Sequence, residues 1–394
     1  MYNFDHLVER QSDKCRKWDK QYIETKFGPI PDDFIPMWIA DMDFQSAPEI
    51  VEKFRQIVDH GTFSYTYCFD EFYDAVIQFQ QVRHQAHVER EWITLTYGTV
   101  STLHYTAQAF CQEGDAILMN TPVYDPFESA AIRQGVQVIK NPLMVGDDLR
   151  YYLDFELLEQ QMVQYQPKLY FFCSPHNPGG RIWMDEEIQK VAELCLKHQI
   201  ILMIDEVHAE HIISGQFSSA FHLPTELQQN MIVLTSPNKG FNLGGLKTSY
   251  SIIPNPHIRQ HFRERLERNS ITSPNVFGVW GIVAAYNHGL AWLDAVTDYI
   301  RGNYHYFVEQ VNAHLPEWQI MPLESSYLAW VDVSKSGMSA KEMTQFLVTH
   351  AGVIVEDGTH YVGNGENYIR INLGTSRELV ERSLQRMIKA LQDR

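Results

Sequence analysis

The sequence of 394 residues has little positive charge, few cysteines and no long apolar run. Its 32 lysines and arginines are outnumbered by 49 aspartates and glutamates, which gives a formal net charge of −17. Proteins that bind nucleic acid need basic surfaces for phosphate contacts, so we expect no nucleic-acid partner. No uninterrupted apolar run approaches the roughly 20 residues of a membrane-spanning helix, so we expect no membrane partner.

The cysteines are too few and too scattered to form a disulfide framework. There are five, an odd number, and no two of them are spaced as C-x-x-C. The first twenty residues also lack the apolar core of a signal peptide. We therefore expect reduced thiols in a cytoplasmic protein, with Cys173 and Cys195 in the core.

From Trp92 onward, short apolar segments alternate with amphipathic ones. The apolar segments predict strands at 93–95, 116–119, 168–173, 200–204 and 231–234. A strand without polar residues is typical of a parallel sheet covered on both faces, and strand–helix–strand order predicts right-handed crossovers. The sequence therefore predicts an α/β fold with a mostly parallel sheet. After Ser249 the sheet pattern fades, and helices are predicted before a smaller α+β unit.

A polar residue follows each of four predicted strands: Tyr124, Asn177, Asp205 and Lys239. Parallel strands bring their carboxyl ends to one edge of the sheet, where ligands bind in open α/β folds. A desolvated lysine amine at that edge is a nucleophile that can form a Schiff base with an aldehyde cofactor. Taken alone, the motif around Lys239 favours a surface lysine in a glycine-rich turn. The convergence of the four residues favours the ligand site.

Two further positions suit anion binding. Gly98, Thr99 and Val100 open a predicted helix, whose free N–H groups and dipole favour a phosphate. Ordinary helix capping by Thr99 or Ser101 is the alternative. Alternation in the strand 368–373 places Arg370 opposite its apolar neighbours, where a guanidinium suits a carboxylate ligand. A surface arginine paired with one of the many acids is the alternative there.

Five motifs give the chain a family resemblance. They are PMWIADMDF at 36–44, SPHNPGGRIW at 174–183, DEVHAEHI at 205–212, SPNKGFNLGGL at 236–246 and YIRINLGTS at 368–376. Together they resemble the fold-type I pyridoxal-phosphate enzymes, which have a three-layer α/β fold like that of aspartate aminotransferase. Within that group, the motifs are most similar to the cystathionine β-lyase-like C–S lyases, the class I/II aminotransferase relatives that include the maltose-regulon modulator type.

The resemblance implies roles for the residues already singled out. Lys239 would bind the cofactor, pyridoxal 5′-phosphate, through a Schiff base, while Asp205 would pair with the ring nitrogen and Tyr124 would stack on the ring. Asn177 and His208 would contact the ring's oxygen side, and Arg370, with Ala40 and Asn177, would bind the substrate. The phosphate would be held by Gly98, Thr99, Val100, Ser236 and, in a homodimer with a shared site, by Tyr65 of the neighbouring subunit.

The resemblance also implies a division of the chain. Residues 1–47 would form an N-terminal segment that joins the small domain, residues 48–286 the large cofactor-binding domain, and residues 287–394 the small C-terminal domain.

Two departures from the wider aminotransferase pattern affect the cofactor site. His208 stands where many aminotransferases carry a tyrosine, as in the C–S lyase branch. Lys247 stands where an arginine commonly binds the phosphate, and a point charge replaces the arginine fork, which leaves its role open. The pairs Asp41/Asp43 and His208/His211 have the look of metal ligands, but the spacing of the histidines departs from H-E-x-x-H, and we expect no metal site.

The implied reaction is α,β-elimination from L-cystathionine or another S-substituted L-cysteine, giving a thiol, pyruvate and ammonia. In it, Lys239 removes the Cα proton of a small amino-acid substrate. Transamination, with an aromatic amino acid among the candidates, uses the same residues and is the first alternative. A regulatory role in which the fold binds another protein is the second.

Overall fold

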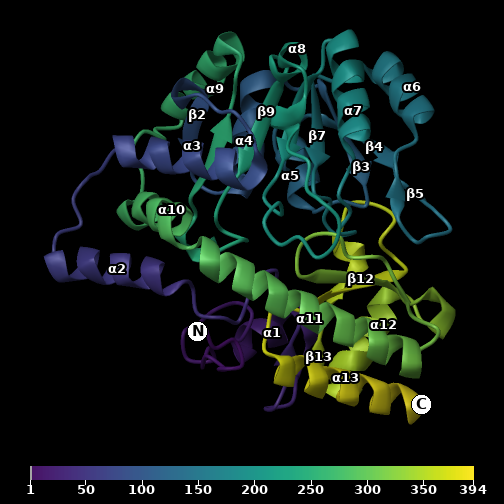
Figure 1. Ribbon diagram of the computed structural model, residues 1–394. Coiled ribbons are helices and arrows are strands. Elements are labelled where there is room, and N and C mark those ends of the chain that lie inside the picture. Colours follow the sequence, from purple (N-terminus) through teal and green to yellow (C-terminus); the bar gives the residue numbers. More distant parts are fainter. Residues whose placement is uncertain (1) are drawn as a thin grey trace.

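The computed structural model describes residues 2–394, which are built around a seven-stranded sheet (Figure 1). The strand order is β2-β10-β9-β8-β7-β3-β4, and every strand except β10 runs in the same direction. The strands are β2 (Ile93–Thr96), β3 (Ala116–Thr121), β4 (Gln137–Pro142), β7 (Leu169–Cys173), β8 (Ile201–Asp205), β9 (Met231–Thr235) and β10 (Ser249–Ile252). The prediction of a mostly parallel sheet is confirmed.

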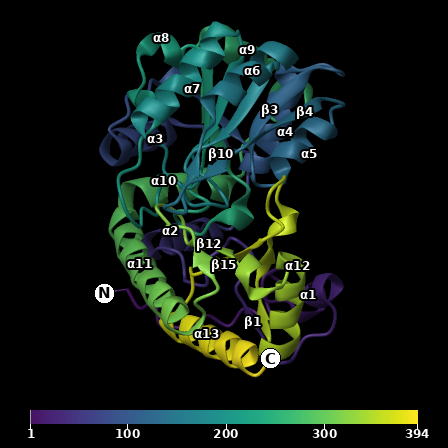
Figure 2. The same ribbon diagram turned by 90° about the vertical axis from the view of Figure 1, so that its right-hand side faces the viewer.

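Helices cover both faces of this sheet, which gives three layers (Figures 1 and 2). Alternate residues of one strand serve opposite layers: Ile117 and Met119 of β3 pack with α4, α5 and α9, whereas Leu118 packs with α3, α6, α7 and α10. These helices are α3 (Asp70–His84), α4 (Thr99–Phe110), α5 (Pro126–Ile132), α6 (Phe155–Tyr165), α7 (Asp185–Lys197), α9 (Pro256–Arg268) and α10 (Val276–His288). The fold is the predicted three-layer α/β arrangement.

A smaller antiparallel sheet lies beside the first and has the order β11-β12-β15-β14. Its strands are β11 (Gln319–Ile320), β12 (Leu328–Asp332), β14 (Glu356–Asp357) and β15 (Tyr368–Asn372). Ile369, Ile371 and Leu373 enter the core beneath α11 (Leu290–His314), α12 (Ala340–Phe346) and α13 (Arg377–Gln392), as their alternation predicted. Arg370 and Asn372 occupy the opposite face and are buried as well.

The N-terminal segment joins this second region, because β1 (Ile35–Pro36) pairs in parallel with β13 (Val353–Ile354). The remaining elements are α1 (Lys20–Phe27), α2 (Pro48–His60), α8 (Thr225–Gln228) and the short hairpin of β5 (Met144–Val145) and β6 (Tyr151–Tyr152). The helix α12 continues at Leu347 as a π-helical turn that ends at Ala351.

Two strands of the large sheet differ from the sequence-based expectation. The sheet does not end at Ser249: β10 begins there and lies between β2 and β9, antiparallel to both. Its serines hid the strand, because they are buried yet polar, and the Ser249 hydroxyl lies 2.6 Å from the Thr96 hydroxyl. The edge strand β4 was also missed, since its exposed and buried residues alternate and no apolar run marks it.

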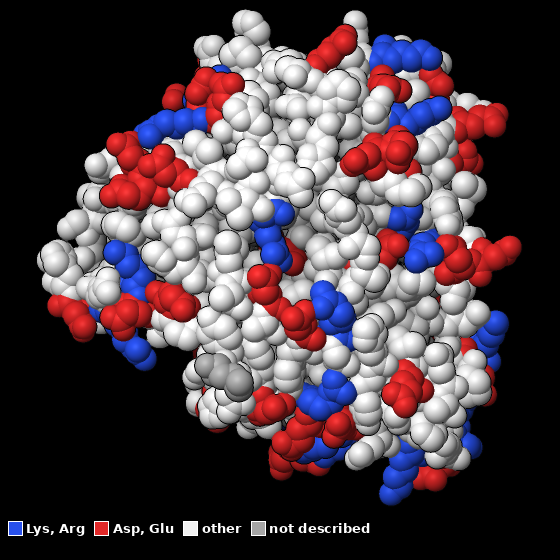
Figure 3. All heavy atoms as spheres, viewed as in Figure 1, with Lys and Arg blue, Asp and Glu red and all other residues white. Residues whose placement is uncertain are grey.

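On the face shown in Figure 3, lysines and arginines are scattered among acidic side chains and form no broad basic patch. Among residues 2–394, no single helix has the length and apolar composition to cross a membrane, although α10 and α11 meet both criteria as a pair bent by 80°.

Candidate active site

The predicted site residues follow four neighbouring parallel strands. Tyr124 comes after β3, Asn177 after β7, Asp205 ends β8 and Lys239 comes after β9. These strands are adjacent in the order β9-β8-β7-β3, so their carboxyl ends lie along one edge of the sheet. The sheet topology therefore brings together the four residues that sequence reasoning selected.

Lys239 is the nucleophile candidate, and its surroundings favour the neutral amine. Its Nζ donates a hydrogen bond to the carbonyl oxygen of Ala40 at 2.5 Å. Burial lowers the pKa of Lys239 to about 8, and the positive charge of Arg370 acts in the same direction, whereas Asp41 and Asp205 oppose the shift. Near pH 8 about half of this lysine is therefore neutral and able to attack a carbonyl.

Asp205 lies at the centre of the four strand ends. Burial raises its pKa to about 6, while a hydrogen bond from the Val207 N–H to Oδ1 at 3.0 Å and the charge of Lys239 favour the carboxylate. At neutral pH the side chain is mostly ionised in a nearly solvent-free place, which suits it to pair with a cationic ring nitrogen.

Arg370 is buried rather than a surface residue, so the alternative of a surface ion pair is wrong. Only 4% of its surface is exposed, and its guanidinium donates to Asn177 Oδ1 at 3.3 Å and to the carbonyl oxygen of Trp38 at 3.1 Å. The guanidinium carbon lies 5.4 Å from the centre of the Tyr361 ring. Its Nε finds no hydrogen-bond partner within residues 2–394. A buried cation with a free donor is suited to a carboxylate ligand.

His208 and His211 differ in their bonding although both are buried. The two ring nitrogens of His211 lie 2.9 Å from Thr297 Oγ1 and 3.2 Å from the carbonyl oxygen of Lys239. His208 Nδ1, by contrast, has no partner in the described part of the chain. Burial and the charges of Lys239 and Arg370 hold the pKa of His208 well below its usual range, so its ring is neutral. An orphaned nitrogen beside these residues is what a ring ligand would satisfy.

The two aspartates considered as metal ligands, Asp41 and Asp43, have other partners. Asp43 accepts from Arg10 Nη1 at 2.8 Å, Lys17 Nζ at 2.8 Å and Trp18 Nε1 at 2.7 Å, while Asp41 pairs with Arg10 at 3.1 Å. Within residues 2–394, no group of three or more histidine, cysteine, aspartate or glutamate side chains is arranged to hold a metal ion. Asp41 and Asp43 therefore hold residues 10–18 of the N-terminal segment beside the site.

The predicted phosphate cradle has an open helix start. Gly98, with φ of +87°, is the N-cap of α4, and no side chain caps the helix. Capping by Thr99 or Ser101, the alternative, is therefore absent from this helix, whose first N–H groups remain available to an anion. Lys247 lies alongside, because a Cβ atom on Gly98 would be 3.8 Å from Lys247 Cδ. Ser236 is buried as well and directly follows β9.

The two tyrosines differ in placement. Tyr124 is 38% exposed and close enough to Arg370 and Asp205 for their charges to affect its pKa, which burial raises. Tyr65 is fully exposed, so within one subunit it lies outside the cluster of buried site residues.

The sequence patterns did not identify three residues near Lys239 as part of the site. The Tyr327 hydroxyl donates to the Ala40 carbonyl oxygen at 3.1 Å. Asn372 Nδ2 donates to the carbonyl oxygens of Ile39 and Asp41, and Asn242 bonds to both the N–H and the carbonyl of Met42. Together they fix the path of the segment 39–44. The alternation that placed Arg370 on the inner face also places Asn372 there, whereas no local signal marks Tyr327 or Asn242.

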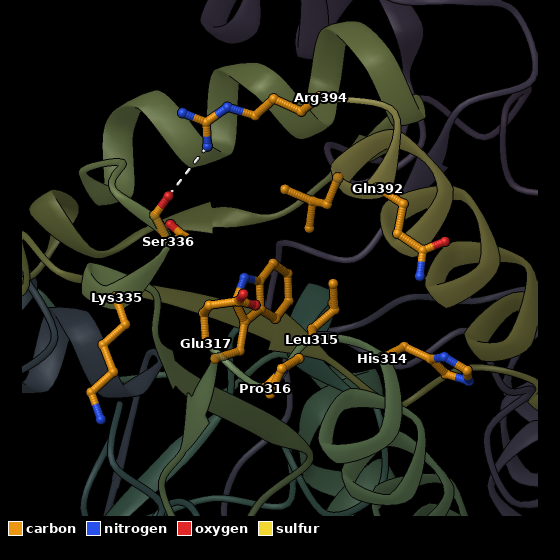
Figure 4. A pocket seen from close by; sticks show the side chains of 10 residues that line it. His314, Leu315, Pro316, Glu317, Lys335, Ser336, Gln392 and Arg394 are labelled. Atoms are coloured by element: carbon orange, nitrogen blue, oxygen red, sulfur yellow. Dashed lines mark hydrogen bonds between the residues drawn. The ribbon is translucent and has the colours of Figure 1, made fainter.

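A separate pocket of about 380 Å³ lies between the ends of α11 and α13 (Figure 4). Its lining includes His314, Glu317, Lys335 and Arg394, and Arg394 donates to the Ser336 carbonyl oxygen at 3.3 Å. None of the predicted site residues lines this pocket.

Comparison with known proteins gives matches over nearly the whole chain. The family model for aminotransferase class I and II matches residues 32–387. Cystathionine beta-lyase PatB of Bacillus subtilis is 36% identical over 99% of this chain and 100% of its own length, and protein MalY of Escherichia coli is 29% identical over 99% of each. The crystal structure of cystalysin from Treponema denticola, which contains a pyridoxal 5′-phosphate cofactor, is similar with a TM-score of 0.95 and 30% identity, covering 100% of this chain and 99% of that one.

Proposed function

We propose that this chain, which belongs to the class I and II aminotransferase family, is a pyridoxal-phosphate-dependent carbon–sulfur lyase. Its substrate is L-cystathionine or a related S-substituted L-cysteine, and its products are a thiol, pyruvate and ammonia. The observation that carries the proposal is the amine of Lys239, whose pKa is about 8, enclosed with Asp205 and Arg370. The names of similar proteins support it, since PatB is a cystathionine β-lyase.

The residues present fit pyridoxal phosphate. The uncapped start of α4 at Gly98, Thr99 and Val100 offers free N–H groups to the phosphate, and Lys247 lies alongside. Ser236, which follows β9, would contribute its hydroxyl. His208 Nδ1 and Arg370 Nε are buried and lack partners among residues 2–394. Polar atoms of this kind are rarely left unpaired in a native protein, so they are suited to a bound polar group.

The chain's own residues account for substrate binding and proton transfer. Arg370, oriented by Asn177, binds the substrate carboxylate next to Ala40. Lys239, as a neutral amine, removes the Cα proton, and the thiolate then leaves from Cβ. When bound, pyridoxal phosphate supplies an electron sink for the carbanion, which a carboxylate such as Asp205 sustains by keeping the ring nitrogen protonated. Tyr124, which is 38% exposed, would stack on the cofactor ring.

We further propose that the active unit is a homodimer in which Tyr65 of one subunit reaches the phosphate of the other. Its full exposure in a single subunit supports this, as do Phe63 and Tyr67, which are also exposed on the same loop.

The proposed division of the chain places the site between its parts. Lys239, Asp205 and Asn177 belong to the large domain, 48–286, whereas Arg370 belongs to the small domain, 287–394. The segment 1–47, whose first residue lies outside the described residues, contributes Ala40. A cytoplasmic location is supported by the absence of disulfides among residues 2–394, where all five cysteines are free.

The decisive test is product analysis with L-cystathionine. The purified protein loaded with pyridoxal phosphate should release pyruvate, detected with lactate dehydrogenase and NADH, and an equal amount of homocysteine, detected as free thiol. Lys239→Ala, which lacks the base, should release neither at a comparable rate. Formation of glutamate from 2-oxoglutarate without pyruvate would instead identify an aminotransferase.

Transamination is the second candidate, because the family takes its name from that reaction. The same lysine would return its proton to the cofactor carbon instead of allowing a leaving group to depart from Cβ. Testing aromatic amino acids with 2-oxoglutarate in the same preparation separates the two reactions, since each gives a different keto acid.

A further inference from the structure

We propose that Glu324 is a positioning residue that holds the Asn177 loop in register with Arg370. The inference rests on the proposed function, in which Asn177 and Arg370 together bind the substrate carboxylate. Glu324 touches neither of them. It acts from the segment Leu323–Tyr327, which lies between β11 and β12.

The Glu324 carboxylate binds the loop that presents Asn177. One oxygen, Oε2, accepts from the Ile182 N–H at 2.8 Å and from Arg181 Nη1 at 3.2 Å, while Oε1 accepts from Arg150 Nε at 3.0 Å. Its side chain is 13% exposed and that of Arg181 is 7% exposed, so water screens the pair little. Three donors on one partly buried carboxylate make a strong and directional anchor.

Main-chain bonds and close packing reinforce the same contact. The N–H groups of Glu324 and Ser325 both donate to the carbonyl oxygen of Gly180 at 3.0 Å. Leu323 packs directly on that residue, because a Cβ atom on Gly180 would lie 2.5 Å from Leu323 Cδ1. The missing side chain of Gly180 therefore lets the loop approach the segment closely enough for the Glu324 anchor to form.

The segment also binds two other parts of the site. The Ser325 hydroxyl donates to the carbonyl oxygen of His208 at 2.6 Å, and the Ser326 N–H donates to that of His211 at 2.9 Å. Tyr327, next along the chain, donates to the Ala40 carbonyl oxygen. The segment Leu323–Tyr327 thus contacts the loops after β7 and β8 as well as the main chain at Ala40.

Continuity of the chain connects this segment to Arg370. β12 begins at Leu328 and pairs with β15, where Trp330 lies opposite Arg370. The direct bond between Arg370 Nη1 and Asn177 Oδ1 is long, at 3.3 Å. It therefore cannot by itself fix the distance between β15, which carries Arg370, and the loop after β7, which carries Asn177. The carboxylate of Glu324, one strand away, supplies the stronger link between the same two regions.

Glu324→Gln is the sharpest change, because it keeps the shape but offers one acceptor oxygen and an amide that would face a donor. We expect KM for L-cystathionine to rise about tenfold with kcat altered by less than about threefold, since binding geometry is lost while Lys239 is untouched. Glu187→Gln is the matched control: Glu187 binds the same arginine at 3.1 Å but lies on α7, away from the segment, and should leave KM nearly unchanged.

A double-mutant cycle with Asn177→Ala separates positioning from general stability. If Glu324 acts through the Asn177 loop, the double variant should have a KM close to that of Asn177→Ala alone. Multiplying fold-changes in KM would show that Glu324 acts independently of Asn177 and would overturn the inference. An equal rise in KM for Glu187→Gln would overturn it too, because the effect would then belong to Arg181 as such.

Hydrogen exchange in the cofactor-free protein gives a readout that needs no activity. Glu324→Gln should speed amide exchange in residues 176–182, where the Ile182 N–H loses its acceptor, and Glu187→Gln should not. Unchanged exchange there would contradict the proposal. If Glu324→Gln does not fold, Glu324→Asp, which keeps the charge at a shorter reach, is measured in its place with a smaller rise expected. Failure of the wild-type protein to release pyruvate would reject the lyase proposal while the exchange result still tests the anchor.

Discussion

Burial makes the Lys239 amine a better nucleophile, and it also lowers the stability of the cofactor-free protein at pH values where the amine is charged. Its pKa is lowered from 10.5 to about 8, first by burial and then by the charge of Arg370. Between pH 8 and pH 10.5 the unfolded chain therefore holds a proton on this lysine that the folded chain lacks. The contribution of Lys239 to the free energy of unfolding must rise with pH across that window. The site is thus less stable where the amine is charged.

The same pKa predicts how the cofactor-free protein captures an aldehyde. Only the neutral amine attacks, so Schiff-base formation with pyridoxal phosphate should speed up from pH 6 to pH 9 with a midpoint near 8. Borohydride trapping followed by peptide mass spectrometry measures the modification at Lys239. In Arg370→Gln the midpoint should move upward, because a neighbouring positive charge is gone. A wild-type midpoint near 10 would contradict this account of the site.

At the scale of the element, the turn after β7 depends on Gly180 for its close packing against the segment before β12. Gly180 has φ of +66°, and a Cβ atom there would lie 2.5 Å from Leu323 Cδ1 and 3.2 Å from the Ser325 carbonyl oxygen. The turn therefore packs against the segment before β12 as closely as main chain allows, and it presents Asn177 at a fixed place.

Gly180→Ala should destabilise the protein by about 2 kcal/mol or more, from both backbone strain and overlap with Leu323. Gly337→Ala is the matched control, since its φ is +75° and nothing lies within 4 Å of the added methyl group. That variant should lose only about 1 kcal/mol, the cost of the left-handed conformation alone. Urea unfolding measures both, and equal losses would exclude a packing role for the Leu323 contact.

The strands that could be predicted from the sequence are those whose buried residues are nearly all apolar. β8 and β9 are apolar up to their last residues, Asp205 and Thr235, and both were predicted as strands. β10 escaped prediction because its serines are polar yet buried, and the partner of the Ser249 hydroxyl, Thr96 of β2, is supplied only by the assembled sheet.

The site residues that could be predicted from the sequence are likewise those that follow apolar strands. Lys239, Asp205 and Asn177 follow apolar strands and were found by position. Tyr327 and Glu324 follow no such strand, and their contacts reach across more than a hundred residues to Ala40 and Arg181. Long-range partners of this kind leave no periodicity in a single sequence, so local patterns could not have revealed them.

At the scale of the whole molecule, the exposed aromatic loop is the feature that a single subunit does not explain. Tyr65 is fully exposed, Phe63 and Tyr67 are 62% and 72% exposed, and Phe63 stacks on Phe277 with 6.0 Å between ring centres. Aromatic groups clustered on a surface are typical of a protein interface. A second copy of the chain is the partner that the proposed shared site requires.

Subunit mixing tests whether sites are shared. Tyr65→Ala and Lys239→Ala should each have little activity alone, but refolding them together creates hybrids in which one site has both residues intact. Random pairing should restore about a quarter of the wild-type activity per subunit. Tyr67→Ala, two residues away on the same loop, should lose far less activity alone than Tyr65→Ala does. Mixtures no more active than their components would show that each subunit forms its site unaided.

The acceptor for the Lys239 amine is the main-chain oxygen of Ala40, and this determines which substitutions the site tolerates. No codon specifies an amide oxygen, so small residues exchanged at position 40 would all present the same group. Harm would come instead from Asn372 and Asn242, whose side chains set the route of that stretch. A saturation scan should therefore record tolerance at Ala40, which makes the contact, and intolerance at Asn372 and Asn242, which hold its main chain in place.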